Sequence, residues 1–318
     1  MRILARRGFT LIELMIALVL LGIVSAAVYK ILVNNQRLYL AQTQTIDLQQ
    51  NMRAAASILP AEFRELDAAD GDITGMGPDS IRMRAMRQLA FVCSQPVLGG
   101  GIGQINLLVR ATPIYGNRQT FSQGDSILVY WEGNRRLRTD DVWLPAQIQS
   151  VTQGPVCPDT TVNVGLTTMN QGFTLQLQPQ WINDPTRNIA GAITRGAPVR
   201  GYDKVAYKVY QASDGNWYLG QRSPAGTGTI QPLIGPLIGS NGVTFTYYDT
   251  AGAVTNVTTQ VSQIDIVLRA RTASPIRKSG NAPQAYKVDS VVTRVALRNN
   301  PRCGSGTVAP IVVYRPCQ

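Results

Sequence analysis

The sequence has 318 residues, of which 44% are hydrophobic and 15% are charged, so its composition is that of a folded protein and not of a disordered one. The formal net charge of +11 can attract nucleic acid, an anionic surface or an acidic partner, but specifies none of them. The absence of histidine excludes catalysis or metal binding that depends on an imidazole.

Residues 9–33 form an almost wholly apolar segment. As a helix, a segment of this size is about 37 Å long, which is enough to cross a bilayer core of roughly 30 Å with some tilt. Glu13 lies inside the segment. A carboxylate in such a place costs on the order of 2.5–3.5 kcal/mol, so it needs a partner.

Three interpretations of this segment compete. A secretory signal peptide has a shorter apolar stretch and a cleavage site after it, which disfavours that interpretation because the helical pattern here continues. An ordinary membrane anchor accounts for the length and for the flanking Arg2, Arg6 and Arg7. It leaves Gly8 and Glu13 unexplained.

The third interpretation rests on residues 8–13, which read Gly-Phe-Thr-Leu-Ile-Glu. This string resembles the prepilin signature of type IV pilins and type II secretion pseudopilins. The resemblance implies that residues 1–8 are a cytoplasmic leader, cleaved after Gly8 by a membrane prepilin peptidase, which then methylates the new amino terminus on Phe9. It also implies that Glu13 neutralises the Phe9 amine of a neighbouring subunit, which supplies the partner that a buried carboxylate needs.

Residues 34–66 are predicted to continue the helix outside the membrane. Mostly apolar residues recur every three or four positions and give the helix one mostly apolar face, at Leu38, Ala41, Thr45, Leu48, Met52, Ala55 and Leu59. This face either supports a globular domain or packs against neighbouring subunits. Pro60 lacks a backbone donor and is predicted to kink or break the helix near residues 57–60.

From residue 67 to residue 318 the sequence consists of short β-like runs separated by Gly, Pro, Asn and Asp. Strands are predicted at residues 105–110, 126–132, 173–178, 205–211, 217–222, 243–249, 261–271 and 288–298. The segment 213–216, Ser-Asp-Gly-Asn, predicts a hairpin, and residues 250–252 predict another. No second long helical pattern appears, so the expected fold is α+β: one long amino-terminal helix on a mainly antiparallel β domain.

The order of these parts resembles the PilW-type minor pilins and the type II secretion minor pseudopilin J. The similarity lies in residues 49–56 and 63–66 at the helix end, in residues 243–249 and 261–271, and in the closing strand at 291–300. Major pilins are far shorter than this chain. The resemblance therefore implies a minor subunit that primes or caps pilus assembly.

That function would place the protein in a bacterial inner membrane as a single-pass protein with its carboxy-terminal domain in the periplasm. The implied partners are the prepilin peptidase and other minor and major pilins or pseudopilins. The alternatives are a secretion pseudopilin at the pseudopilus tip and a subunit of a DNA-uptake or adhesive pilus. No nucleophile motif and no Cys/His pair is present, which favours a protein that is not an enzyme.

The four cysteines are Cys93, Cys157, Cys303 and Cys317, and an even number on the exported side favours two disulfides. Three pairings are open. Proximity favours Cys303–Cys317, which leaves Cys93–Cys157. The wide spacing and the absence of histidine disfavour zinc.

Two weaker sites remain. Asp67, Asp70 and Asp72 surround a turn and could bind Ca²⁺, although a solvated turn is the favoured interpretation, and no other cofactor is expected. Three basic clusters, together with nearby Trp and Tyr, could bind DNA, although arginines on the wet face of strands are the favoured interpretation. These clusters are Arg82, Arg84 and Arg87; Arg135, Arg136 and Arg138; and Arg269, Arg271, Arg277 and Lys278.

Overall fold

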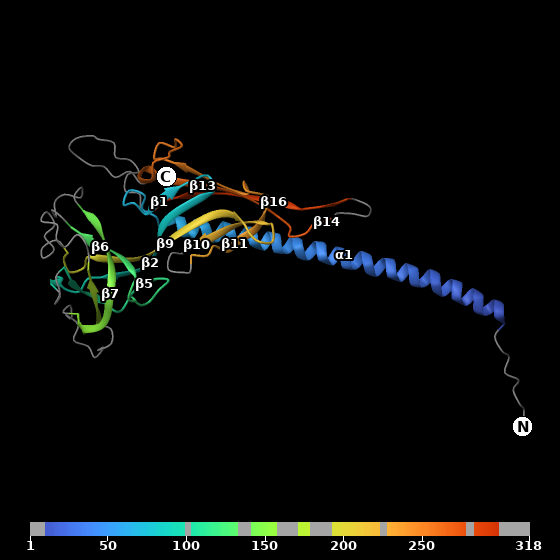
Figure 1. Ribbon diagram of the computed structural model, residues 1–318, viewed down its shortest axis with the longest axis horizontal. Helices are drawn as coiled ribbons and strands as arrows, with labels where there is room; N and C mark the ends of the chain where they lie inside the picture. Colours follow the sequence, from blue (N-terminus) through green and yellow to red (C-terminus); the bar gives the residue numbers. More distant parts are fainter. Residues whose placement is uncertain are drawn as a thin grey trace, which may run out of the picture.

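The computed structural model describes residues 10–98, 103–132, 141–157, 171–178, 193–222, 228–277 and 283–298. One long helix, α1 (Leu11–Arg64), begins at the amino-terminal end, and its last third packs against an antiparallel β domain (Figure 1). The predicted α+β fold is confirmed.

The helix is buried on one face only where it reaches the β domain. Its buried residues are Leu48, Met52, Ala55, Leu59 and Phe63, which follow one another at helical spacing. Leu38, on the same predicted stripe, is 55% exposed, so burial begins about ten residues later than the apolar pattern does.

The helix does not break at Pro60, as the sequence had suggested, but continues to Arg64. Leu59 and Phe63 are 1% and 0% exposed on either side of the proline. Both are anchored in the same core, and this packing holds the turn in place although Pro60 donates no hydrogen bond.

The first lobe of the β domain packs around the helix end. Its core joins the buried helix residues to Tyr207 and Phe245, whose rings each lie 5.9 Å from the ring of Phe63 in edge-on contacts. Its strands are β1 (Ile73–Met76), β2 (Ser80–Phe91), β9 (Pro198–Gln211), β10 (Trp217–Arg222), β11 (Gln231–Leu237), β12 (Val243–Tyr248), β13 (Gln263–Arg271) and β16 (Val288–Ala296), with a separate pair formed by β14 (Ile276–Arg277) and β15 (Gln284–Ala285).

The second lobe lies beyond the helix end, on the side away from the amino terminus (Figure 1). Its core contains no residue of α1 and includes Ile105, Leu107, Ile127, Leu144 and Leu175. Its strands are β3 (Val97–Leu98), β4 (Ile105–Arg110), β5 (Tyr115–Gly116), β6 (Ser126–Trp131), β7 (Val142–Val156) and β8 (Gln171–Leu177).

Two long strands, β2 and β9, join the lobes. They pair antiparallel along almost their whole length, from Ser80↔Lys208 to Phe91↔Pro198. The other edge of β9 pairs with β10 in the first lobe and with β6 in the second. A core residue of each lobe therefore lies on the same strand: Val199 in the second and Val205 in the first.

An ion-pair network lies at the same junction. Arg87 on β2 contacts Glu62 on α1 at 2.9 Å and Asp203 on β9 at 3.2 Å. Arg118 contacts Asp203 at 2.8 Å and Asp125 at 3.1 Å. Helix and lobes are thus linked by charge as well as by the shared strands.

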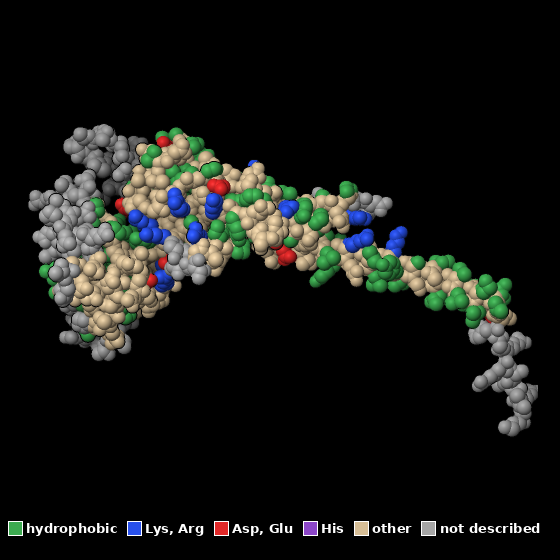
Figure 2. Space-filling view, in the orientation of Figure 1, with side chains coloured by type: hydrophobic (Ala, Val, Ile, Leu, Met, Phe, Trp, Pro, Cys, Tyr) green, Lys and Arg blue, Asp and Glu red, His purple; other side chains and the backbone are tan. Residues whose placement is uncertain are grey.

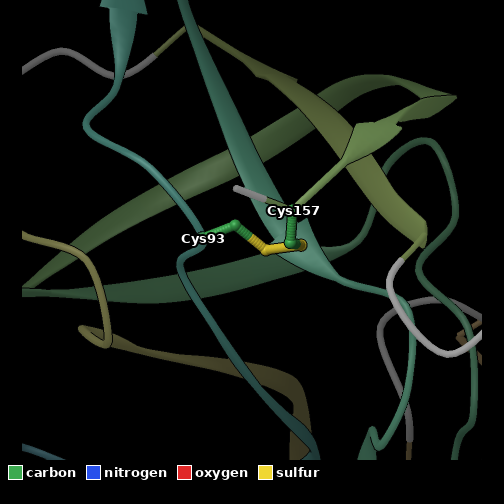
Figure 3. Close-up of a disulfide and its surroundings, with 2 residues drawn as sticks. All are labelled: Cys93 and Cys157. Carbon is green, nitrogen blue, oxygen red and sulfur yellow. A yellow bond between two sulfur atoms is a disulfide. The ribbon is translucent and has the colours of Figure 1, made fainter. Parts of the chain in front are cut away.

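The Cys93–Cys157 disulfide closes the second lobe (Figure 3). It joins the segment after β2 to the residue that follows β7, across a sequence separation of 64 residues and a Cα–Cα distance of 5.3 Å. Both cysteines are 2% exposed. Cys303 and Cys317, the other pair that the sequence favoured, lie outside the described residues.

Both predicted hairpins are present. In the first, β9 and β10 are joined by a turn in which the Asp214 carboxylate accepts from the Asn216 N–H and Gly215 has φ 78°. In the second, Gly252 has φ 79° and donates to the carbonyl of Asp249. These left-handed positions explain the glycines in both turns.

We expect Phe63→Ala to lower the free energy of unfolding by roughly 3–5 kcal/mol, because it leaves a cavity among helix, Tyr207 and Phe245. The measurement is chemical denaturation of the purified protein in detergent, followed by tryptophan fluorescence. Leu40→Ala is the control, since Leu40 is 59% exposed. Equal stability of the two variants would mean that this contact does not hold the helix to the β domain.

Candidate assembly segment at the amino-terminal helix

The first half of α1 carries apolar side chains that nothing in the described structure covers. Figure 2 shows them along the free part of the helix. An 18-residue window of the helix has a mean hydropathy of 2.7 and none of it is buried, so this helix is long and apolar enough to cross a membrane. The large apolar residues from Leu11 to Leu32 are between 50% and 78% exposed. Such a surface needs either lipid or another apolar helix.

Thr10 and Glu13 form a reciprocal cap at the start of this helix. The Glu13 N–H donates to the Thr10 hydroxyl oxygen at 3.3 Å, and the Thr10 N–H and hydroxyl donate to Glu13 Oε2 at 3.3 and 3.2 Å. These bonds satisfy donors that the first helical turn leaves free. They also hold the Glu13 carboxylate at the amino-terminal end of the apolar helix. Gly8 and Phe9 lie outside the described residues.

The three aspartates after the helix come together, but around an arginine. Asp72 is 1% exposed, and its Oδ2 accepts from Arg200 at 2.8 Å and from the Asp67 N–H at 3.0 Å. The Asp70 N–H donates to Asp67 Oδ1 at 3.2 Å. Among the described residues, no group of three or more Cys, Asp or Glu could hold a metal ion. The cation beside Asp72 is the Arg200 guanidinium.

The acidic turn is electrostatically strained. Burial raises the pKa of Asp67 to about 6, and the charge of Asp70 acts in the same direction. Burial also raises the pKa of Asp70, with a further contribution from the charge of Asp72. The positive charge of Arg200, which contacts the turn from β9, opposes both shifts.

The structure redistributes the basic clusters. Arg87 forms ion pairs with Glu62 and Asp203, whereas Arg82 and Arg84 lie on the outer side of β2. Arg271 donates to Asn216 at 2.9 Å and lies 4.0 Å from the centre of the Tyr286 ring, and Arg269 and Arg277 are exposed. Arg135, Arg136, Arg138 and Lys278 lie outside the described residues.

Comparison with known families gives one match at the amino terminus. Residues 4–29 match the prokaryotic N-terminal methylation motif. This motif indicates a type IV pilin-like prepilin. With the whole chain, no significant match is found among curated proteins or solved structures.

For a prepilin-like protein, the motif implies processing by a prepilin peptidase and assembly with other pilins. The helix geometry fits that use, because the motif occupies the exposed apolar part of α1 and leaves the β domain free.

Two side-chain interactions were not predicted from the sequence. Thr10 and Glu13 have the Thr-x-x-Glu spacing of a capping box, so the signal for the cap was present. The ion pair of Asp72 with Arg200 joins residues 128 apart and has no local signal.

We expect the mature protein to begin at N-methylated Phe9, because the Gly8–Phe9 junction lies inside the matched motif. Intact-mass analysis of protein from cells with an active prepilin peptidase measures this. Gly8→Trp, which places a bulky side chain at the junction, should retain the leader. Retention of Met1 in the wild-type protein would contradict the prediction.

We expect Asp67→Asn to raise the free energy of unfolding at pH 7. The Asp67 pKa rises from 3.8 to about 6 on folding, so the neutral carboxyl favours the folded state. That contribution is complete below pH 3.8 and is lost as the pH rises through about 6. Asparagine keeps the acceptor for Asp70 without the charge.

The measurement is denaturation of both proteins in detergent at several pH values between 4 and 7. The free energy of unfolding of the variant should exceed that of the wild type by more at neutral pH than at acidic pH. Asp47→Asn, at an exposed helix position, is the control for net charge. A gain independent of pH would rule out the buried carboxyl as its cause.

Proposed function

We propose that this protein is a minor subunit of a type IV filament system, anchored in the inner membrane by α1 and placed at the top of the filament, where its β domain primes or caps assembly. The second lobe carries this proposal. It extends past the carboxy-terminal end of the helix, away from the amino terminus (Figure 1).

The helix supports the assembly role. Its apolar half is exposed in the isolated chain, and both lipid and a bundle of neighbouring helices can cover it. When a subunit leaves the membrane and enters a filament, neighbouring helices replace lipid around this apolar surface. The same surface therefore serves both the anchored and the assembled state.

The second lobe supports the position at the top. In a filament whose subunits are stacked along their helices, the space beyond the helix end belongs to the next subunit above. Here that space is occupied by the lobe built on Ile105, Ile127 and Leu175, which packs on itself and not on α1. A subunit without an upper neighbour accommodates such a lobe.

The disulfide supports export of the β domain. Disulfides persist in oxidising compartments such as the periplasm, and Cys93–Cys157 is buried in the second lobe. The proposed orientation therefore has the leader in the cytoplasm and the β domain in the periplasm.

We expect Glu13→Ala to give few or no surface filaments while the subunit stays in the inner membrane. The change removes a charge from the apolar helix, so insertion is at least as favourable as before. It also leaves the Phe9 amine of a neighbouring subunit without its carboxylate at low dielectric, which is costly. Surface filaments and membrane levels of the protein are measured together.

Glu13→Gln is the matched variant, because its amide oxygen can still accept from Thr10 while the charge is lost. If the ion pair is what matters, both variants lose filaments. Normal filaments with Glu13→Gln would assign the defect of Glu13→Ala to the helix cap. Normal filaments with both variants at wild-type protein levels would overturn the assembly role of Glu13.

A further inference from the structure

The outer face of β2, β9 and β10 carries five basic side chains on three adjacent strands. Along β9, Val205, Tyr207 and Val209 are buried in the first core. Side chains alternate along a strand, so Lys204, Ala206 and Lys208 lie on the opposite face. The same face receives Arg82 and Arg84 from β2 and Arg222 from β10. We call Arg82, Arg84, Lys204, Lys208 and Arg222 the basic face.

The pairing register places these charges side by side. Arg84 lies directly opposite Lys204, and Ala206 has Arg82 on one side and Arg222 on the other. Like charges opposite each other destabilise a sheet. None of the five side chains has an ion pair to an Asp or Glu in the described part of the chain. Figure 2 shows Lys and Arg gathered on the face of the β domain turned to the viewer.

Two adjoining hollows lie between the long cations. They measure about 310 and 460 Å³ and share Arg82, Ala206 and Arg222 in their walls. Lys208 lines the first hollow and Lys204 lines the second. The hollows therefore leave room for an anionic chain beside these cations.

Tyrosines stand at both ends of the basic face. Arg84 lies 5.6 Å from the centre of the Tyr202 ring. At the other end, Tyr210 lies opposite Tyr218 with ring centres 6.3 Å apart, and the Tyr218 hydroxyl donates to Asp214 at 2.7 Å. From Tyr202 to Tyr210 the strand spans about 27 Å. That length suits several nucleotides of a single strand.

We propose that the basic face binds single-stranded polynucleotide, with phosphates on the five cations and bases stacked against Tyr210 and Tyr218. Cations that track a backbone, interleaved with aromatic rings, are the general chemistry of single-strand binding without sequence preference. Phosphates of the anchoring membrane are out of reach. Phe63, which contacts Tyr207 beneath the face, lies about 45 Å along the helix from residue 33.

The experiment is fluorescence anisotropy of a labelled oligothymidine of about 20 nucleotides, titrated with the full chain in neutral detergent micelles. Salt is varied between about 50 and 200 mM. Five phosphate contacts give a slope of log K against log salt of about −3.5 for a single strand. The double variant Lys204→Gln with Lys208→Gln, which loses two of these contacts, should have a shallower slope of about −2.

The matched control is Arg37→Gln with Arg53→Gln, which removes the same charge at exposed positions of α1, the helix that packs against the opposite face of β9. This control should bind as the wild type does. If the two double variants weaken oligothymidine binding equally, the effect depends only on net charge, and this result would overturn the site. No binding by the wild-type chain at the lowest salt would overturn it as well.

The bases are tested separately. Tyr210→Ala should weaken oligothymidine binding at least about 5-fold and leave an abasic oligomer of the same length unaffected. Polygalacturonate of equal charge should compete poorly. Equal binding of oligothymidine, abasic oligomer and polygalacturonate by the wild type would mean a general polyanion surface and would overturn the polynucleotide assignment.

Discussion

The burial of one helix face against the first lobe is the interaction on which the rest of the structure depends. Leu48, Met52, Ala55, Leu59 and Phe63 give the carboxy-terminal end of α1 a fixed position, with Phe63 between two aromatic rings. The first half of the helix is covered by nothing in the described chain. The β domain thus packs against one end of the helix, and lipid or another apolar helix must cover the other end.

The second constraint is the continuity of β2 and β9. Because each strand carries core residues of both lobes, the lobes cannot move apart without breaking the ladder from Ser80↔Lys208 to Phe91↔Pro198. The network of Arg87, Glu62 and Asp203 adds a charged contact at the same place. The helix, which the matched motif assigns to processing and assembly, therefore positions the far lobe rigidly.

Much of the fold was predictable because it rests on local patterns. The expected strands at 105–110, 217–222 and 243–249 match β4, β10 and β12 closely. By contrast, β2 and β7 were not predicted. In β2, arginines, methionines and alanines take the place of β-branched residues, and β7 contains Pro145 and Gly154. These strands form because neighbours on both sides of the sheet supply the hydrogen bonds and the cores.

The sequence by itself determined the apolar helix, its capping residues, the motif at residues 4–29 and the antiparallel class of the β domain, since each depends on residues close together in the chain. Only the tertiary structure decided that α1 continues through Pro60, because packing at Leu59 and Phe63 outweighs the lost hydrogen bond. The tertiary structure also decided that Arg87 forms an ion pair with Glu62, whereas Arg82 lies near Lys204 and Arg222 on the outer face of the sheet. Strand register determines which of these residues, distant in sequence, become neighbours.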